Sequence, residues 1–184
     1  MGGENKLLLP LDGIPVLART LMAFDYAPSV AEIVVAAREE DLLTVGDLCK
    51  AYGLVKPVKI IIGGDSRTGS VLRAALECSE KSRLIAVHDG ARPLVTVDLI
   101  EAVIAKAEDC AAAAPAVPVK DTIKIAVDGV VRSTPDRETL RAVQTPQVFD
   151  AQFLRAALQS ALDAGASLTD DCAAVERLGK EVAL

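Results

Sequence analysis

Apolar positions along the chain alternate between two patterns. Short continuous runs rich in β-branched residues predict buried strands at 32–37, 59–62 and 84–88. Each run is followed by a polar or glycine-rich turn and then by apolar positions that repeat with helical period, which predicts helices at 39–52, 70–78 and 97–110. Continuous apolar strands that alternate with helices are typical of a sheet covered on both faces. We therefore expect an α/β fold with a doubly wound, mostly parallel sheet.

Helices are also predicted near both ends of the chain. Gly13 and Pro15 precede a helical pattern that runs to about Asp25, because proline is tolerated in the first turn of a helix. Glycine stop signals and a threonine cap predict two more helices at 150–164 and 170–178.

A β-hairpin interrupts this alternation. Two β-rich segments, 122–126 and 130–133, flank Asp128-Gly129, a dipeptide that favours a tight hairpin turn. A hairpin that projects from a parallel domain is stabilised by a partner surface. We expect one domain over residues 1–184 with an inserted arm at about 120–148, through which two copies form a homodimer.

Composition excludes several classes of protein. The 184 residues suit one domain, and 51% hydrophobic residues exclude a disordered chain. The net charge of −6 and the 3% aromatic content argue against nucleic acid as a partner. The longest apolar stretch, 111–119, is broken by two prolines and is far shorter than the about 20 residues of a membrane span. Four widely spaced cysteines without a C-x-x-C pair suit reduced thiols. From these two features we expect a soluble cytoplasmic protein without a membrane partner.

Candidate chemistry lies in the turns after the strands, where ligands bind in doubly wound sheets. Gly63-Gly64-Asp65-Ser66-Arg67 precedes a helix that should start near Ser70, so a ligand could meet bare backbone and N–H groups there. The alternative is an ordinary glycine turn with a serine cap.

A second turn contains His88-Asp89-Gly90-Ala91-Arg92-Pro93. Asp89 offers a carboxylate for Mg²⁺ or a substrate hydroxyl, and the Arg92 guanidinium suits a phosphate. The alternative is an Asp89–Arg92 ion pair that only shapes the turn. His88, the single histidine, ends an apolar strand and is interpreted as a packed residue rather than a catalyst.

The order and spacing of several motifs resemble one enzyme family over nearly the whole chain. The motifs are GGDSRTGSV (63–71), VHDGARP (87–93), PVKDTIK (118–124), Arg137, QTPQVF (144–149) and LTDD (168–171). They resemble the 2-C-methyl-D-erythritol 4-phosphate cytidylyltransferases of the non-mevalonate isoprenoid pathway. The resemblance implies a Rossmann-like nucleotidyltransferase fold that uses Mg²⁺, CTP and methylerythritol phosphate to make 4-diphosphocytidyl-2-C-methyl-D-erythritol and pyrophosphate.

The resemblance also implies roles for individual residues. It assigns catalysis to Lys6, Asp89, Arg92 and Arg137. It assigns substrate binding to Gly63, Gly64, Asp65, Ser70, Thr122, Thr145 and Thr169. Within these sets Gly63, Gly64, Asp65 and Ser70 would hold the cytosine, Lys6 would steady the α-phosphate, and Asp89 would meet Mg²⁺ held mainly by CTP. Thr122 and Arg137, on the arm, would act in the partner subunit's site.

The chain differs from the family pattern at both ends, and two rival functions fit the same motifs. The family's opening strand with its glycine-rich loop and its final segment are not found in residues 1–184, so we expect the natural chain to be longer. One rival is a ribitol 5-phosphate cytidylyltransferase. The identity of one residue, Ala91, argues against it. The other is a non-catalytic nucleotide-binding regulator, which would not need Lys6, Asp89, Arg92 and Arg137. Pyrophosphate release with each polyol phosphate distinguishes these three functions.

Overall fold

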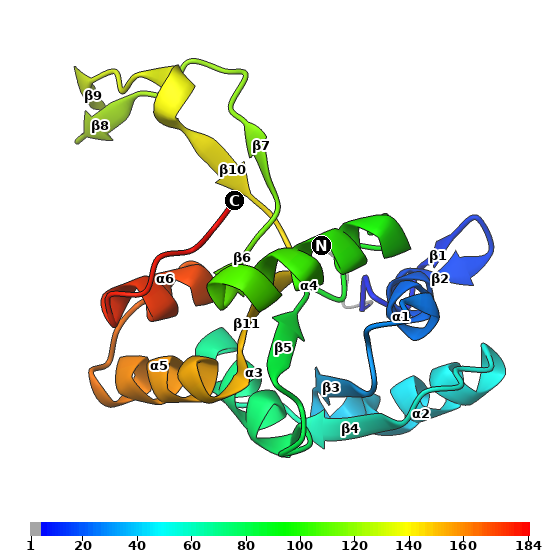
Figure 1. The fold of residues 1–184 in the computed structure, drawn as a ribbon. Helices are drawn as coiled ribbons and strands as arrows, with labels where there is room; N and C mark the ends of the chain where they lie inside the picture. The colour runs from blue at the N-terminus through cyan, green and yellow to red at the C-terminus, as the bar shows by residue number, and fades with distance from the viewer. Residues whose placement is uncertain (1–4) are drawn as a thin grey trace.

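The computed structural model describes residues 5–184 and has the predicted α/β organisation. Helix α1 (Val16–Tyr26) precedes three strand–helix units (Figure 1). These are β3 (Ile33–Ala37) with α2 (Leu42–Ala51), β4 (Val58–Ile62) with α3 (Arg67–Glu77), and β5 (Leu84–Val87) with α4 (Val97–Cys110). The last helices are α5 (Ala151–Asp163) and α6 (Asp171–Arg177), and two 3-10 turns cover Glu39–Asp41 and Arg137–Thr139. Within residues 5–184 no helix is long and apolar enough to cross a membrane.

The central strands form two separate ladders. β3 pairs with β4 in parallel, from Ile33 opposite Val58 to Ala37 opposite Ile62. β11 (Gln147–Asp150) pairs in antiparallel fashion with β5 on one side and with β6 (Ala112–Ala113) on the other. The α/β class is thus confirmed, and the return strand from the arm adds antiparallel pairs to the sheet.

Helices cover both faces of the three-stranded ladder. Successive side chains of β11 point to opposite faces and pack against different helices. Phe149 is fully buried against α3, α5 and α6, whereas its neighbour Val148 packs against Val103 and Ala107 of α4. A separate cluster joins α1 and α2 to β3 and β4. The fold therefore has a helical layer on each side of its strands, as the continuous apolar runs predict.

The predicted hairpin forms the tip of a projecting arm (Figure 1). β8 (Ile125–Val127) and β9 (Val130–Ser133) are joined through Asp128 and Gly129, whose φ angles of 50° and 74° suit the expected tight turn. The base of the arm is β7 (Ala116–Pro118) paired with β10 (Arg141–Val143). The expected range of 120–148 differs at its end, because Gln147 and Val148 are buried in the body as part of β11.

A second hairpin lies before α1 and was not anticipated. β1 (Pro10–Leu11) pairs with β2 (Ile14–Pro15) across Asp12 and Gly13, which have φ angles of 52° and 76°. Asp-Gly is the same signal that identifies the arm. Gly13 and Pro15 were predicted to open the following helix, whereas α1 begins only at Val16.

All four cysteines are free thiols, in agreement with the expected reduced state. Cys49 and Cys172 are buried. Burial raises the pKa of the Cys172 thiol to about 12, so this sulfur stays protonated and acts as a small apolar group.

We expect Leu72→Ala to lower the free energy of unfolding by about 2–5 kcal/mol, because Leu72 is 7% exposed and packs in the cluster of α3, α5 and α6. Leu76→Ala, one turn later on the same helix at 61% exposure, is the matched control and should change it by roughly 0.5 kcal/mol or less. Urea unfolding of both variants measures the difference. Equal losses would show that this cluster does not stabilise the body.

Candidate active site at the strand ends

The glycine turn after β4 packs closely against the start of α3. Gly63 N–H donates to the carbonyl of Ala37 at 2.9 Å, and Gly64 N–H donates to Ser70 Oγ at 2.9 Å. A Cβ atom added to Gly64 would lie 2.7 Å from the carbonyl carbon of Gly69. Glycine at position 64 is therefore required by close approach of two backbone segments.

Helix α3 begins earlier than the sequence predicts. Ser66 Oγ accepts from Gly69 N–H at 3.0 Å and caps the helix, so Ser70 lies inside its first turn rather than at its start. The Ser70 hydroxyl also donates to the carbonyl of Ser66 at 2.9 Å. These bonds fix the turn, while the neighbouring Asp65 is exposed. The result is a rigid glycine loop at a helix N-terminus, an arrangement suited to close contact with a ligand.

The second turn contains an ion pair between Arg92 and Asp89. Arg92 Nε donates to Asp89 Oδ2 at 2.9 Å, so the pairing considered as an alternative does shape this turn. Both side chains are about half exposed, at 46% for Arg92 and 41% for Asp89. An exposed pair of this kind contributes little to stability. Both groups thus remain accessible to a charged ligand.

Arg67 connects the two turns and was missed as an individual site residue. Its guanidinium donates to both carboxylate oxygens of Asp171, at 3.0 and 2.7 Å, and lies 3.9 Å from Asp89 Oδ1. The Asp171 side chain is only 1% exposed. Burial raises the pKa of Asp171 and the guanidinium opposes that shift, while the bond to Asp171 raises the pKa of Arg67. The available signal was a pair of carboxylates, Asp170 and Asp171, directly before the apolar segment 172–175.

Gln147 brings the QTPQVF and LTDD motifs together. Its side-chain oxygen accepts from the backbone N–H groups of Asp171 and Cys172, at 3.1 and 3.2 Å. Its Nε2 donates at 2.9 Å to Asp170, which caps α6 through Ala173 N–H. The start of α6 is thereby held against the start of β11.

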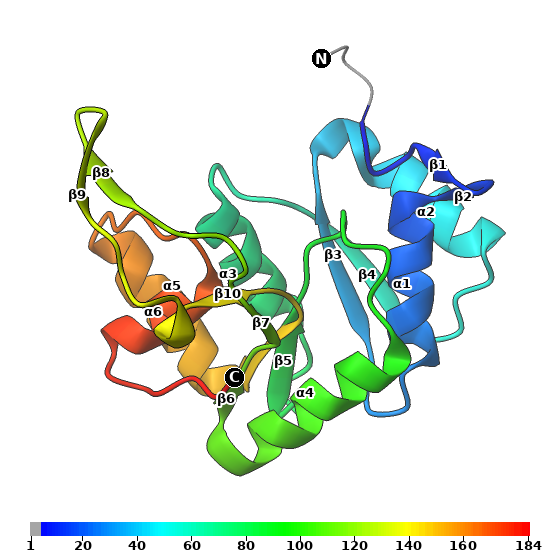
Figure 2. The ribbon, with the colours of Figure 1, turned by 90° about the horizontal axis from the view of Figure 1, so that it is seen from above.

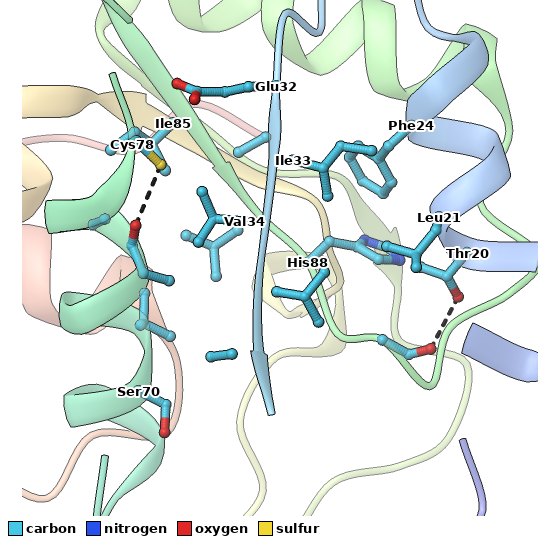
Figure 3. Close-up of a pocket in the computed structure, with 18 of the residues that line it drawn as sticks. Thr20, Leu21, Phe24, Glu32, Ile33, Val34, Ser70, Cys78, Ile85 and His88 are labelled. Carbon is cyan, nitrogen blue, oxygen red and sulfur yellow. Dashed lines mark hydrogen bonds between the residues drawn. The ribbon is translucent and has the colours of Figure 1, made fainter. Parts of the chain in front are cut away.

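His88 is held as a packed neutral residue, as predicted. Its Nδ1 lies 2.9 Å from Thr145 Oγ1 and its Nε2 lies 3.1 Å from the carbonyl of Arg92. Because a carbonyl only accepts, we assign the ring proton to Nε2 and the donated bond to the Thr145 hydroxyl. The ring of Phe24 lies 5.0 Å from that of His88, and Figure 3 shows both beside α1. Thr145 Oγ1 also lies 3.4 Å from Asp89 N–H, so it joins the second turn to the arm's return.

The remaining candidate residues lie on other segments of the chain. Lys6 is exposed and follows Asn5, whose side chain donates to Asp41 at 3.0 Å. Thr122 and Arg137 are exposed on the arm, where Arg137 Nη1 donates to the carbonyl of Lys120 at 2.9 Å. Thr169 is exposed just before α6. The chain therefore joins Gly63, Gly64 and Ser70 in one turn and Asp89, Arg92 and Thr145 around the other, while the arm projects away from the body (Figure 1).

The site fits a divalent cation only as a partner of a phosphorylated ligand. In the part of the chain from residue 5 onward, no group of three or more His, Cys, Asp or Glu side chains is placed to hold a metal. Asp89 supplies hard carboxylate oxygens at an accessible position. Mg²⁺ commonly takes one or two carboxylates and completes its coordination with substrate phosphates and water.

We expect the single histidine to titrate below its ordinary pKa of about 6.5. Burial is the main cause, with an opposing contribution from the bond to Arg92. Since the folded pKa is lowered, the stabilising contribution is complete above about pH 6.5 and is lost as pH falls toward the folded pKa. Proton NMR of His88 measures this directly, and His88→Gln should remove that part of the pH dependence of unfolding. A folded-state pKa at or above 6.5 would contradict the packed arrangement.

Comparisons with known proteins point to one family. The family described as "IspD: 2-C-methyl-D-erythritol 4-phosphate cytidylyltransferase" matches residues 1–184. The chain is 43% identical over 180 residues to the 2-C-methyl-D-erythritol 4-phosphate cytidylyltransferase of Bacillus cytotoxicus, covering 98% of this chain and 79% of that protein. It is 46% identical over 186 residues to the protein of the same name from Symbiobacterium thermophilum, covering 98% and 75%.

Solved structures agree with the sequence relatives. A 4-diphosphocytidyl-2C-methyl-D-erythritol synthase from Anaerococcus prevotii superposes with a TM-score of 0.88 at 27% identity, covering 95% of this chain and 77% of that one. The 2-C-methyl-D-erythritol 4-phosphate cytidylyltransferase from Thermus thermophilus gives a TM-score of 0.78 at 33% identity, covering 97% and 82%. With the motifs GGDSRTGSV and VHDGARP at the ends of β4 and β5, the chain belongs to the 2-C-methyl-D-erythritol 4-phosphate cytidylyltransferase family.

Proposed function

We propose that the ends of β4 and β5 are the place where this family member joins CTP to 2-C-methyl-D-erythritol 4-phosphate in isoprenoid synthesis. The observation that carries this proposal is the Arg67 guanidinium, which lies beside the glycine turn and 3.9 Å from Asp89. A phosphate oxygen of methylerythritol phosphate attacks the α-phosphorus of CTP, and the bond to the β-phosphate oxygen breaks as pyrophosphate leaves. Positioning and charge stabilisation supply the catalysis, since no covalent enzyme intermediate is needed.

The glycine turn is the proposed cytosine site. Backbone groups of Gly63 and Gly64 and the Ser70 hydroxyl can pair with the edge of a pyrimidine, with Asp65 at the rim. Their hydrogen bonds to one another hold the turn before any ligand arrives. A purine is larger, and the close packing of Gly64 against Gly69 would keep the turn from widening to admit it.

The second turn is the proposed phosphate site. Arg92 would contact the phosphates and Lys6 would steady the α-phosphate, while Thr145 supports the backbone of Asp89. The net charge of −6 opposes anionic substrates only weakly, because salt screens charges beyond about 8–10 Å. Cationic groups within a few ångströms therefore dominate.

Mg²⁺ is the proposed cofactor, with Asp89 as its protein ligand. When bound, the ion neutralises phosphate charge and orients the leaving pyrophosphate. The Arg92 bond to Oδ2 restricts the Asp89 side chain, and Oδ1, which accepts no hydrogen bond from residues 5–184 and lies 3.9 Å from Arg67 Nη2, would be the oxygen that meets the ion.

We expect Asp89→Asn to lower the rate of pyrophosphate release from CTP and methylerythritol phosphate by about 10²–10³-fold and to raise the Mg²⁺ concentration required. The matched control is Asp12→Asn, a fully exposed carboxylate on the β1–β2 hairpin, where asparagine tolerates the positive φ angle. The assay uses the full-length enzyme, with ribitol 5-phosphate as the competing acceptor. Near-normal turnover of Asp89→Asn would remove Asp89 from the site, and preference for ribitol phosphate would overturn the proposed acceptor.

We further propose that the arm joins two subunits and completes the partner's site. Four apolar residues of the hairpin, Ile125, Val127, Val130 and Val131, are each about half exposed. A two-stranded hairpin with an exposed apolar surface is stabilised by packing on a partner. Arg137 and Thr122 lie on the same arm and would contact methylerythritol phosphate in the other subunit, opposite Thr169 of that subunit's body.

Mixing two inactive variants tests this sharing. If Lys6 and Arg137 of one site come from different chains, random mixing of Lys6→Ala and Arg137→Ala subunits makes half of the dimers hybrids, each with one intact site. About a quarter of wild-type activity should return. Mass spectrometry confirms that hybrids form. Hybrids without recovered activity would show that Arg137 serves its own chain.

A cytoplasmic location is proposed for the enzyme. All four cysteines are free, and two of them are buried, which suits a reducing compartment.

A further inference from the structure

A buried glutamine lies between the arm's return and the start of α6. Gln147, the first residue of β11, is only 2% exposed. Figure 2 shows α3, α5 and α6 together beside β5, the strand that pairs with β11. A side-chain amide has an oxygen that accepts and an NH₂ group that donates, and burial of either without a partner is costly. The partners of Gln147 therefore show what this residue holds in place.

The hydrogen bonds of the Gln147 side chain hold the start of α6 in two ways. Its oxygen accepts from the backbone N–H groups of Asp171 and Cys172, and its Nε2 donates to Asp170 Oδ2 at 2.9 Å. The other oxygen of Asp170, Oδ1, accepts from Ala173 N–H and caps the helix. The cap therefore does not require the bond to Oδ2. That bond instead fixes where the segment before α6 lies.

The segment before α6 is held on both sides of Thr169. Leu168 packs against the core cluster of α3, α5 and α6, and Asp170 is bonded to Gln147. The Thr169 side chain between these two residues is exposed. Both neighbours thus restrict the backbone of Thr169, while its hydroxyl remains accessible to a ligand.

Two further contacts fix this segment relative to the functional turns. Arg67, at the start of α3 after the glycine turn, bonds to Asp171 and lies 3.9 Å from Asp89. Thr145, two residues before Gln147, accepts from the N–H group of Asp89 at 3.4 Å. The start of α6 therefore has a defined place beside both turns, and Gln147 belongs to the chain segment that holds it there.

We propose that Gln147 is a positioning residue for the sugar-alcohol substrate, because it places Thr169 where its hydroxyl can bind methylerythritol phosphate. The inference rests on the proposed function, in which Thr169 contacts that substrate. A group that is already held in place binds a ligand without the entropic cost of being ordered. Loss of the bond from Gln147 to Asp170 therefore weakens binding of methylerythritol phosphate. CTP binding is retained, since the glycine turn is held by hydrogen bonds of its own.

The test replaces Gln147 with glutamate in the full-length enzyme. In Gln147→Glu one carboxylate oxygen still accepts from the two N–H groups of α6, but the other faces Asp170 Oδ2 and has no proton to donate. At saturating CTP, the KM for methylerythritol phosphate should rise about tenfold or more, the effect of one lost hydrogen bond to a charged group. At saturating methylerythritol phosphate, the KM for CTP should change by less than about twofold.

A paired substitution reverses the direction of the bond. In Gln147→Glu/Asp170→Asn, the amide introduced at position 170 can donate to the carboxylate introduced at position 147, and its oxygen can still cap α6. This double variant leaves the net charge unchanged and should return the KM for methylerythritol phosphate to within about threefold of the wild-type value.

Gln159→Glu is the matched control. Gln159 donates to Asp163 at 2.8 Å on the exposed face of α5, so this variant loses the same kind of bond outside the site. Both KM values should stay unchanged. Circular dichroism checks that every variant is folded. If Gln147→Glu is unfolded, or if its carboxyl is protonated and donates as the amide does, Gln147→Met takes its place, because methionine has a similar length and no donor.

Thr169→Val distinguishes failure of this inference from failure of the proposed function. Thr169→Val and the Gln147 variant should both raise the KM for methylerythritol phosphate. If only Thr169→Val raises it, Gln147 is not a positioning residue and the proposed function stands. If Thr169→Val leaves it unchanged, the proposed role of Thr169 is wrong and this inference falls with it. Equal rises in both KM values, or a rise that the paired substitution does not reverse, would show that Gln147 only supports the fold.

Discussion

The bidentate ion pair between Arg67 and Asp171 is the interaction on which the site depends. It joins residues 104 positions apart and links the start of α3 to the start of α6. Because Asp171 is buried, loss of the guanidinium would leave an unpaired charge, a change that costs about 3–5 kcal/mol in buried pairs. The same guanidinium reaches toward Asp89, so the pair that closes the fold also sets the distance between the two functional turns.

In the proposed function, binding of anions by this acidic protein is a local property. The Ser70 hydroxyl holds the glycine turn, because it accepts from Gly64 N–H and donates to the carbonyl of Ser66. The turn therefore needs no rearrangement to meet a ligand. Preorganised groups of this kind stabilise charge without a cost of reorganisation. The net charge of −6 describes the whole surface and is screened over distances at which Arg92 and Arg67 still act directly.

Stability belongs to the body, whereas the arm has the proposed role of completing a partner's site. The body is formed around Phe149, Leu154 and Leu158, which are fully buried between the helices and β11. The arm has exposed residues along β8 and β9 and contributes little to that core. A segment of this kind is free to specialise in contact with another subunit, as the proposed function requires.

Local chemistry allowed the sequence to determine most of the fold and part of the site. The strands near 33–37, 58–62 and 84–87 follow from apolar runs, and the arm's turn follows from Asp128-Gly129. The start of α3 was misplaced by three residues, because Ser66 and Ser70 are both plausible caps and only the bond from Gly69 N–H selects Ser66.

The tertiary structure decided what depends on residues distant in the chain. The contact of Arg67 with Asp171 and the double role of Gln147 at α6 have no local signature. The pairing of β11 with β5 on one side and β6 on the other likewise depends on segments distant in the chain. Periodicity and turn chemistry are properties of neighbouring residues and can be read from the sequence, whereas ion pairs and strand neighbours are set by how complete helices and strands pack.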